Sequence, residues 1–557
     1  MDFSFQTNAA DHDAAADTPP GPEAGSAGIA IGVVREIDGG SAICRFDPAA
    51  LNSLKSNPDQ TIASSGQVGS QIKVKVGDFW LLGNVRNLRV DPAKEDAVIA
   101  NVDFLGEGNE AADGRLTAFR RGVTRYPMPG TPVVTVSRPD LDAVFAADER
   151  PHIEIGTVYP TEGVRGALFV DPMLGKHFAL LGSTGTGKST SAALILHRIV
   201  DQNPEGHIVM LDPHGEYAAA FATNGEIFNV DNVELPYWLM NFEEHCEVFI
   251  TTEGAEREQD MDILAKCVLA ARSKSRVAQS LGKLTVDSPV PYLLSDLIGA
   301  ISAGMGKLDK ANDTAPYMRL KSKVEELKGD PRYSFMFNGL LVSDSMSTFM
   351  SKIFRLPAEG KPISIVDLSG VPTDIVTVVV AVLSRLTFDY AIWSRRESQK
   401  PILLVCEEAH RYVPSDRSTA PSAVRKVLES IAKEGRKYGV SLGLITQRPS
   451  DLAEGVLSQC GTIISMRLNN ERDQMYVRNA MPEGARGFLD AIPALRNREC
   501  IVCGEGVNIP IRVRLDDLDA NLRPASDDPL FSELWKEKGG EKEILDRTIH
   551  RWRGQGR

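Results

Sequence analysis

Hydrophobic and polar positions alternate in the first part of the chain. In "QIKVKV", residues 71–76, isoleucine and valine alternate with lysine, which is the period of a half-buried strand. Two more short strands are predicted around the turn at Asp38-Gly39-Gly40. Several short strands at this spacing predict a small β-barrel over residues 28–150.

Continuous apolar runs replace this alternation in residues 151–245 and 360–515. Each run ends in a loop and passes into a helical pattern, as in "HFALLG", "HIVMLDPHG", "ISIVDLSG", "ILLVCEEAH", "VSLGLITQRP" and "GTIISMRL". Apolar strands that alternate with helices predict a parallel sheet covered on both faces. The predicted fold class is therefore α/β, with these two segments forming one core.

Three other segments differ from this core in pattern or composition. Residues 246–359 show helical periodicity without strands, which predicts a helical insertion. Residues 1–27 are rich in Ala, Asp, Pro and Gly and are expected to be disordered. Residues 516–557, ending "EKEILDRTIHRWRGQGR", are expected to form an exposed helical tail.

Composition restricts the partners and the compartment. The formal net charge of −13 argues against an outer surface that coats nucleic acid, although a local basic channel remains compatible with it. The longest apolar run, residues 376–383, is far shorter than the roughly 20 residues of a membrane span. The N-terminus has no basic-then-apolar signal, and seven scattered cysteines suit a reducing cytosol. We expect a cytoplasmic protein without a membrane span, with Cys500 and Cys503 in a core strand.

The stretch "GSTGTGKST" satisfies the phosphate-loop pattern between an apolar strand and a helix. Its glycines let backbone N–H groups surround phosphates, and the helix N-terminus adds positive potential. Lys188 is expected to reach the β- and γ-phosphates of ATP, and Ser189 to hold Mg²⁺. The predicted nucleotide-binding residues are Gly182, Ser183, Thr184, Gly185, Thr186, Gly187, Lys188, Ser189 and Thr190.

"ILLVCEEAH" places two adjacent glutamates at the end of an apolar strand. Adjacent side chains near a strand end point to different sides, so one can face a metal and the other the γ-phosphate. We assign Glu407 to Mg²⁺ and Glu408 to the general base that hydrolysis needs. The alternative is a solvated acidic strand end, and His410 is either a structural helix-start residue or a coupling residue.

Two further strand ends belong to the same predicted crevice, since ligands lie at the carboxyl ends of parallel strands. "LDPHGEY" places Asp212, His214 and Glu216 after one strand. "LITQRP" places Thr446 and Gln447 after another, where a polar side chain can sense the γ-phosphate. The alternative for each residue is an ordinary turn.

Cations from a neighbouring subunit often assist phosphoryl transfer. Arg436 and Lys437, in "LESIAKEGRKYGV", are candidates, together with Lys176 in "LGKHFALLG". The alternative is that cations in the last turn before Gly439 only complement the helix dipole.

The order "GSTGTGKST", "DPHGEY", "VCEEAH", "GRKYGVSLGLITQRP" resembles the HerA branch of the HerA–FtsK group of hexameric ATPases. The N-terminal region, with "RRGVTRYPMPG" leading towards the core, is similar to the small barrel of HerA proteins. The resemblance covers residues 28–515 and implies a RecA-like core. It also implies a homohexameric ring that moves double-stranded DNA through its pore by ATP hydrolysis.

Residue roles follow from the same resemblance. It places the Walker lysine at Lys188, the catalytic glutamate at Glu408, the acid of "DPHGEY" at Asp212, the sensor glutamine at Gln447, and the inter-subunit arginine finger at Arg436. Two positions depart from the pattern. Glu407 stands where many such ATPases have Asp. The nucleotide-binding candidate Lys176 stands where relatives often carry arginine; lysine keeps the charge but lacks the two-pronged guanidinium of arginine.

HerA relatives work with NurA-type nucleases in end resection, or with sirtuin-like or nuclease effectors in antiphage defence, so an effector partner is expected. Candidate DNA contacts, to phosphates only, follow the catalytic strand; the alternative is a solvated mixed-charge loop. These contacts are Arg411, Arg417, Arg425 and Lys426. Two other functions remain open: a secretion or conjugation motor, and a nucleotide-stabilised scaffold for a partner enzyme.

Overall fold

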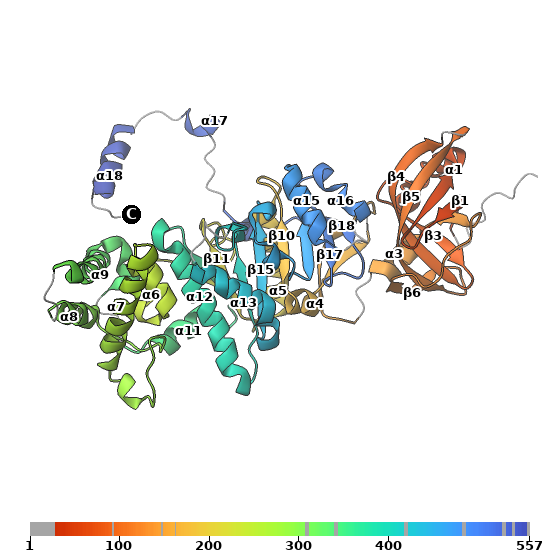
Figure 1. Ribbon diagram of the computed structural model, residues 1–557. Helices are drawn as coiled ribbons and strands as arrows, with labels where there is room; N and C mark the ends of the chain where they lie inside the picture. The colour runs from red at the N-terminus through yellow and green to blue at the C-terminus, as the bar shows by residue number, and fades with distance from the viewer. Residues whose placement is uncertain are drawn as a thin grey trace, which may run out of the picture. The chain divides into compact units, whose positions relative to one another are not determined.

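The chain divides into two units between Val144 and Phe145, and each unit has its own β-sheet (Figure 1). The computed structural model describes residues 28–91, 94–145, 149–161, 163–306, 311–338, 343–416, 422–481, 486–525, 531–536 and 541–553. The segment 1–27, expected to be disordered, lies outside the described residues.

The first unit is a small barrel. Its strands are β1 (Ala30–Ile37), β2 (Ser41–Phe46), β3 (Gln71–Val76), β4 (Phe79–Asp91), β5 (Lys94–Glu110), β6 (Leu116–Arg121) and β7 (Pro132–Thr135). They lie in the order β2-β1-β7-β3-β4-β5-β6, and β2 also pairs with β5. This pairing closes the barrel and leaves β6 outside the closed ring. The predicted barrel is confirmed.

Lys73, on the polar positions of β3, is fully buried rather than solvated. Its ammonium lies 2.9 Å from the carboxylate of Asp140, on helix α3 (Arg138–Phe145), and over the ring of Trp80. Asp140 also accepts hydrogen bonds from the backbone of Leu116 and Ser137. The helix covers this face of the strand, which alternation along the strand could not reveal.

The second unit is built on an eleven-stranded sheet. Its strands are β8 (His152–Val158), β9 (Arg165–Phe169), β10 (Phe178–Leu181), β11 (Ile208–Asp212), β12 (Gly225–Phe228), β13 (Ile363–Asp367), β14 (Ile402–Cys406), β15 (Val440–Thr446), β16 (Thr462–Ser465), β17 (Glu499–Gly504) and β18 (Ile511–Leu515). They lie in the order β12-β13-β11-β14-β15-β10-β16-β17-β18-β8-β9.

The expectation of a parallel sheet holds for only part of this order. Strands from β12 to β16 pair in parallel, whereas β16–β17, β17–β18, β18–β8 and β8–β9 are antiparallel. The links β17–β18 and β8–β9 are too short for the crossover that parallel strands need. The sheet is therefore mixed. Cys500 and Cys503 are buried in β17, as the sequence predicts.

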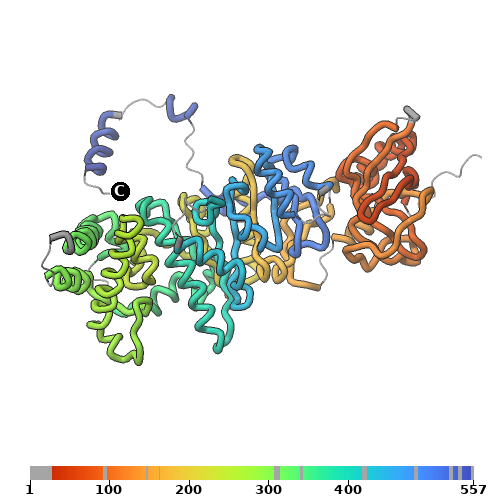
Figure 2. The backbone as a smooth tube through the Cα atoms, in the orientation of Figure 1, coloured from red at the N-terminus to blue at the C-terminus, as the bar shows by residue number. Residues whose placement is uncertain are grey.

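Helices cover this sheet and form a separate group beside it. Around the sheet lie α4 (Val170–Gly175), α5 (Lys188–Gln202), α12 (Thr373–Trp393) and α13 (Ser422–Tyr438). Between β12 and β13 the described residues form helices and no strand: α6 (Phe242–Phe249), α7 (Gly254–Ser273), α8 (Leu294–Met305), α9 (Ala311–Gly329), α10 (Ser334–Phe337) and α11 (Met346–Phe354). Figure 2 shows α7, α8 and α9 together at the end of the unit away from β10. Near the C-terminus are α17 (Phe531–Leu534) and the exposed α18 (Glu541–Arg553).

Helix α12 is the one helix of the described residues that is long and apolar enough to cross a membrane. The most apolar 18-residue window of its span Thr373–Arg396 has a mean hydropathy of 1.8, and 72% of that window is buried inside the protein. The helix packs against α13, α6 and strands β14 and β15. Its apolar character is therefore accounted for by its place in the core.

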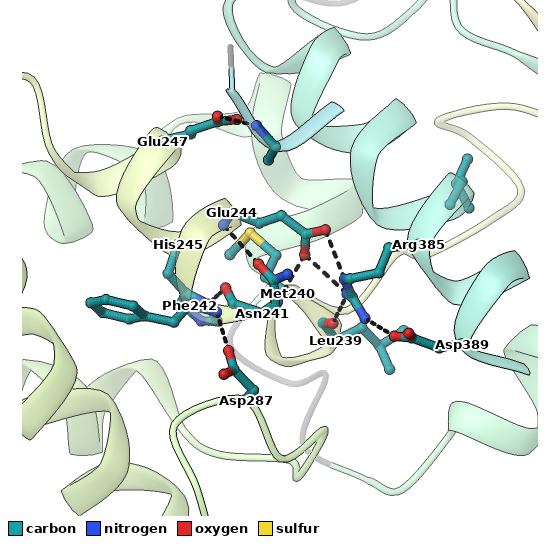
Figure 3. A network of polar contacts seen from close by, with 12 residues as sticks. Leu239, Met240, Asn241, Phe242, Glu244, His245, Glu247, Asp287, Arg385 and Asp389 are labelled. Carbon is teal, nitrogen blue, oxygen red and sulfur yellow. Dashed lines mark hydrogen bonds and ion pairs between the residues drawn. The ribbon is translucent and has the colours of Figure 1, made fainter. Parts of the chain in front are cut away.

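A buried polar network joins α6 to α12 (Figure 3). Arg385 donates to both carboxylate oxygens of Glu244, at 2.8 and 2.9 Å, and to Asp389 and the backbone oxygen of Leu239. Glu244 and Asn241 also form the capping box that begins α6. Because Glu244 is only 1% exposed, its charge depends on these partners.

Helix α6 also holds the start of α13. Glu247 accepts a hydrogen bond from the backbone N–H of Ala423 at 2.8 Å (Figure 3). One turn away, Glu243 lies 2.5 Å from the ammonium of Lys426. Carboxylates at a helix N-terminus satisfy free N–H groups and favour the helix dipole.

We expect Glu244→Ala to lower the free energy of unfolding by about 3 kcal/mol, because Arg385 is then left without its buried partner. Asp389→Ala removes the more exposed acid from the same arginine and should cost less than about 1 kcal/mol. Urea unfolding followed by tryptophan fluorescence measures both. Equal losses in the free energy of unfolding for the two variants would contradict the larger contribution that we assign to the Glu244–Arg385 contact.

Candidate nucleotide-binding site

The loop between β10 and α5 is shaped by its glycines. Gly185 and Gly187 have φ values of +77° and +92°, which favour glycine, and Gly187 caps the N-terminus of α5. A Cβ atom at Gly182 would lie 2.9 Å from the Cβ of Met466, so this position has no room for a side chain. The loop is a backbone cradle at the start of a 15-residue helix, a geometry suited to phosphate.

The ends of the two neighbouring strands hold this loop. Gly182 donates its N–H to the backbone oxygen of Thr446 at 3.3 Å, at the end of β15. Ser183 donates to the backbone of Arg467 at 3.0 Å, and its hydroxyl accepts from Asn469. Thr186 is buried, whereas the remaining side chains of the loop, those of Thr184, Ser189 and Thr190, are exposed or half-buried.

Lys188 lies between the two glutamates at the end of β14. Its ammonium is 2.7 Å from Glu407 and 3.6 Å from Glu408, and all three side chains are less than a tenth exposed. Burial alone would lower the pKa of Lys188, but the two carboxylates outweigh burial and raise it. The lysine is therefore held in its charged form, as phosphate binding requires.

The two glutamates differ in their environments. Burial raises the pKa of Glu407 to about 7, against the opposing effect of Lys188. Burial also acts on Glu408, but the imidazole of His410, 3.2 Å away, and the charge of Lys188 leave its pKa below the usual value. Glu408 is thus the carboxylate held ionised, which is the state that a general base needs.

Glu408 has a left-handed backbone, with φ of +51°. A positive φ in a residue other than glycine is strained and is retained where surrounding contacts fix it. Here His410, in a short 3-10 helix (Ala409–Arg411), lies 3.2 Å from the Glu408 carboxylate and 2.9 Å from the Thr446 hydroxyl. His410 therefore links the ends of β14 and β15.

Gln447, directly after β15, reaches the phosphate loop itself. The hydroxyl of Thr184 donates a hydrogen bond to Oε1 of Gln447. The structure thus brings Gln447, Lys188, Glu407 and Glu408 together at the carboxyl edge of the sheet.

Asp212 is buried at the end of β11, but its carboxylate faces its own loop. Oδ1 accepts from the N–H groups of His214 and Gly215, at 3.2 and 2.9 Å, and Oδ2 accepts from Tyr217 at 2.9 Å. These hydrogen bonds fix the shape of "DPHGEY". Glu216 lies near enough to Lys188 to contribute to its raised pKa.

The sequence assigned no role to Tyr217, yet it lies at the centre of the site. Its hydroxyl is completely buried and donates to Oε2 of Glu407 at 3.2 Å. Glu407 contacts Lys188, the first residue of α5, and Ser189 is the next residue of that helix. This donor set fits Mg²⁺, which prefers oxygen ligands.

Arg498, at the start of β17, was also missed. Its N–H donates to the backbone oxygen of Thr186 at 3.0 Å, and its side chain lies against Gly187. Its φ of +63° is left-handed, like that of Glu408. Tyr217 could have been noticed inside "DPHGEY", whereas no pattern in the sequence distinguishes Arg498.

Two predicted cations lie at the other edge of the sheet. Lys176 precedes β10 and is paired with Glu505 at 2.9 Å. Arg436 is exposed in the last turn of α13, beside a hollow of about 520 Å³ lined by the starting residues of β11, β14 and β15. Strand β10 alone, at about 3.3 Å per residue, separates this edge from the phosphate loop by on the order of 13 Å. Neither residue reaches the phosphate loop of its own chain.

The candidate DNA contacts differ in their surroundings. Arg411 is exposed on the 3-10 helix, and Arg417 lies outside the described residues. Arg425 is bound to Glu429 and to the backbone oxygen of Pro414. Lys426 is paired with Glu243, as described above. Arg425 and Lys426 are thus engaged by carboxylates, and the DNA contacts stay a prediction.

Comparison with known proteins relates the chain to one family. Residues 153–387 match the family model described as the central domain of helicase HerA. The DNA double-strand break repair helicase HerA of Pyrococcus furiosus is 27% identical over 78% of this chain and 82% of its own length. That of Sulfolobus acidocaldarius is 27% identical over 76% and 80%. VirB4 of Thermoanaerobacter pseudethanolicus aligns with a TM-score of 0.49 at 15% identity, over 68% of this chain and 99% of that chain.

We expect Asp212→Ala to lower the free energy of unfolding by about 2 kcal/mol, because buried N–H groups lose their acceptor. Asp212→Asn keeps one acceptor oxygen, so metal-free binding of a fluorescent ATP analogue should change less than about twofold. The control is Asp367→Asn, at the end of the neighbouring strand β13. Among the described contacts, the Asp367 carboxylate accepts a hydrogen bond only from the N–H of Ser369. Loss of metal-free binding in Asp212→Asn without loss of stability would instead indicate direct contact with the nucleotide.

Proposed function

Because this chain belongs to the HerA-type P-loop ATPases, we propose that it forms a ring that moves double-stranded DNA by hydrolysing ATP. The observation that carries this proposal is the division of the site between the two edges of the sheet. The phosphate loop and both glutamates lie at the carboxyl edge, and Arg436 lies at the amino edge. A neighbouring copy that presents its Arg436 to this phosphate loop completes the site.

ATP hydrolysis follows from the residues around the loop. The loop N–H groups and the α5 N-terminus hold the phosphates, and Lys188 exchanges its glutamates for the β- and γ-phosphate oxygens. Glu408, held by His410, takes the proton of the attacking water, while Gln447 lies where the γ-phosphate is sensed. When bound by Ser189 and Glu407, Mg²⁺ supplies positive charge to the β- and γ-phosphates.

A ring of six copies agrees with this trans arrangement, in which each site borrows a cation from its neighbour. Arg436 offers a planar fork for phosphate oxygens, and Lys176 offers a second, compact charge from the same edge. Both are solvent-accessible in the single chain, as a contribution to a neighbour requires.

Double-stranded DNA is the proposed cargo because the HerA relatives of Pyrococcus furiosus and Sulfolobus acidocaldarius are DNA double-strand break repair helicases. With a net charge of −13, the protein would contact DNA locally, in the pore. Arg411 is accessible for such contacts, whereas Arg425 and Lys426 must first leave their carboxylate partners.

We place the motor with an effector, a NurA-like nuclease or a sirtuin-like or other nuclease enzyme, in DNA end processing or antiphage defence. The separately folded barrel is the proposed docking unit. All seven cysteines are unpaired and buried, which supports action in the reducing cytoplasm.

We expect linear duplex DNA to stimulate ATP hydrolysis by the wild-type protein. Glu408→Gln should reduce turnover by about 100-fold or more with and without DNA, because the base is lost while the shape is kept. Phosphate release measures both proteins. Turnover indifferent to DNA would overturn the proposed cargo, and a fully active Glu408→Gln would overturn the assigned base.

Mixing inactive variants tests the trans position of Arg436. Arg436→Ala and Lys188→Ala should each be inactive alone, but mixed rings should recover part of the turnover. In such rings an intact phosphate loop on one chain meets an intact Arg436 on its neighbour. Lys188→Ala mixed with Glu408→Gln is the control, because both changes disable the same site and no intact site can form. Absence of recovery in mixed rings of verified composition would overturn the trans assignment.

A further inference from the structure

Glu407 has a different partner on each carboxylate oxygen. Oε1 accepts from Lys188 at 2.7 Å, and Oε2 accepts from Tyr217 at 3.2 Å. Tyr217 is completely buried, and Glu407 is 3% exposed. Tyr217 is therefore the second partner of Glu407, one of the two residues that fit Mg²⁺.

Nucleotide binding removes one of these partners. Lys188 turns to the phosphates, so Oε1 of Glu407 is released in a buried place. A buried carboxylate oxygen without a partner is unfavourable, so the carboxylate would move unless another contact holds it. The Tyr217 contact does not involve Lys188 and persists through this exchange.

The loop before Tyr217 fixes where its hydroxyl lies. Asp212 accepts the N–H of Tyr217, and the backbone of Asp212 accepts from Leu368 at 2.8 Å, beside β13. At the residue before Tyr217, the backbone oxygen of Glu216 accepts a hydrogen bond from the N–H of Ala525 at 2.9 Å. The hydroxyl is thus set in place before any ligand binds, which lowers the cost of ordering it later.

We propose that Tyr217 is a positioning residue that holds the Glu407 carboxylate in the arrangement needed for Mg²⁺. This inference rests on the proposed nucleotide site and divides the work of "DPHGEY" between two side chains. The aspartate shapes the loop, and the tyrosine orients the Glu407 carboxylate. The metal-dependent part of nucleotide affinity is the property that Tyr217 controls.

Tyr217→Phe removes only the hydroxyl and tests this directly. The Mg²⁺ concentration that half-saturates binding of a fluorescent ATP analogue should rise about 10- to 100-fold, the usual effect of losing an outer partner of a metal ligand. Binding of the same analogue in EDTA should stay within about twofold of wild type, because the phosphate loop is unchanged. Steady-state turnover at saturating ATP, without the analogue, should show the same shift in Mg²⁺ requirement.

Tyr412→Phe is the matched control. Tyr412 is also completely buried, four residues after Glu408, and its hydroxyl has no hydrogen-bond partner among the described residues. Its removal should leave the Mg²⁺ requirement unchanged. Combining Tyr217→Phe with Glu407→Gln should add no further shift to that of Glu407→Gln, since the hydroxyl acts through this carboxylate.

Three outcomes overturn the proposal. The first is that Tyr217→Phe weakens nucleotide binding equally in EDTA and in Mg²⁺. The second is that Tyr217→Phe melts at the wild-type temperature and has an unchanged Mg²⁺ requirement. The third is that the shifts in Mg²⁺ requirement of Tyr217→Phe and Glu407→Gln add fully. The readout is binding, so it is separate from the motor proposal. If DNA fails to stimulate turnover while the Mg²⁺ shift appears, the cargo is wrong and the role of Tyr217 stands.

Discussion

The buried contact between Lys188 and the two glutamates of β14 is the constraint on which the rest of the site depends. It joins residues 219 positions apart, and none of the three side chains has enough water around it to stabilise a lone charge. The three groups therefore need one another as charge partners. This demand fixes the ends of β14 and β10 at one edge, with β15 between them.

Contacts around this ion pair extend to every neighbouring strand end. His410 connects Glu408 to Thr446, Gln447 connects β15 to the phosphate loop, and Tyr217 connects Glu407 to the loop after β11. The positive φ of Glu408 is kept within these contacts. Side chains therefore tie the ends of β11, β14 and β15 to one another and to the phosphate loop.

The opposite edge of the sheet has a different organisation. Helix α13 ends there with Arg436. At its start, Glu247 of α6 accepts from the N–H of Ala423, and Glu243 of α6 pairs with Lys426. Helix α6 is in turn fixed to α12 through Glu244 and Arg385. Helix α13, which carries the proposed inter-subunit cation Arg436, is thus held at its start by α6. Because α6 belongs to the helices between β12 and β13, these contacts connect that helical segment to the sheet.

The sequence by itself determined the phosphate loop, the strand that ends in Glu407 and Glu408, the barrel and the α/β class, because each depends on local spacing or periodicity. It did not determine the antiparallel part of the sheet, since strand direction depends on which strands become neighbours. Only the tertiary structure revealed that the Asp212 carboxylate faces its own loop and that Tyr217 and Arg498 approach the phosphate loop. It also decided that Lys73 is buried and that Lys176 and Arg436 lie far from the loop. Those facts depend on contacts between distant segments, which no local pattern encodes.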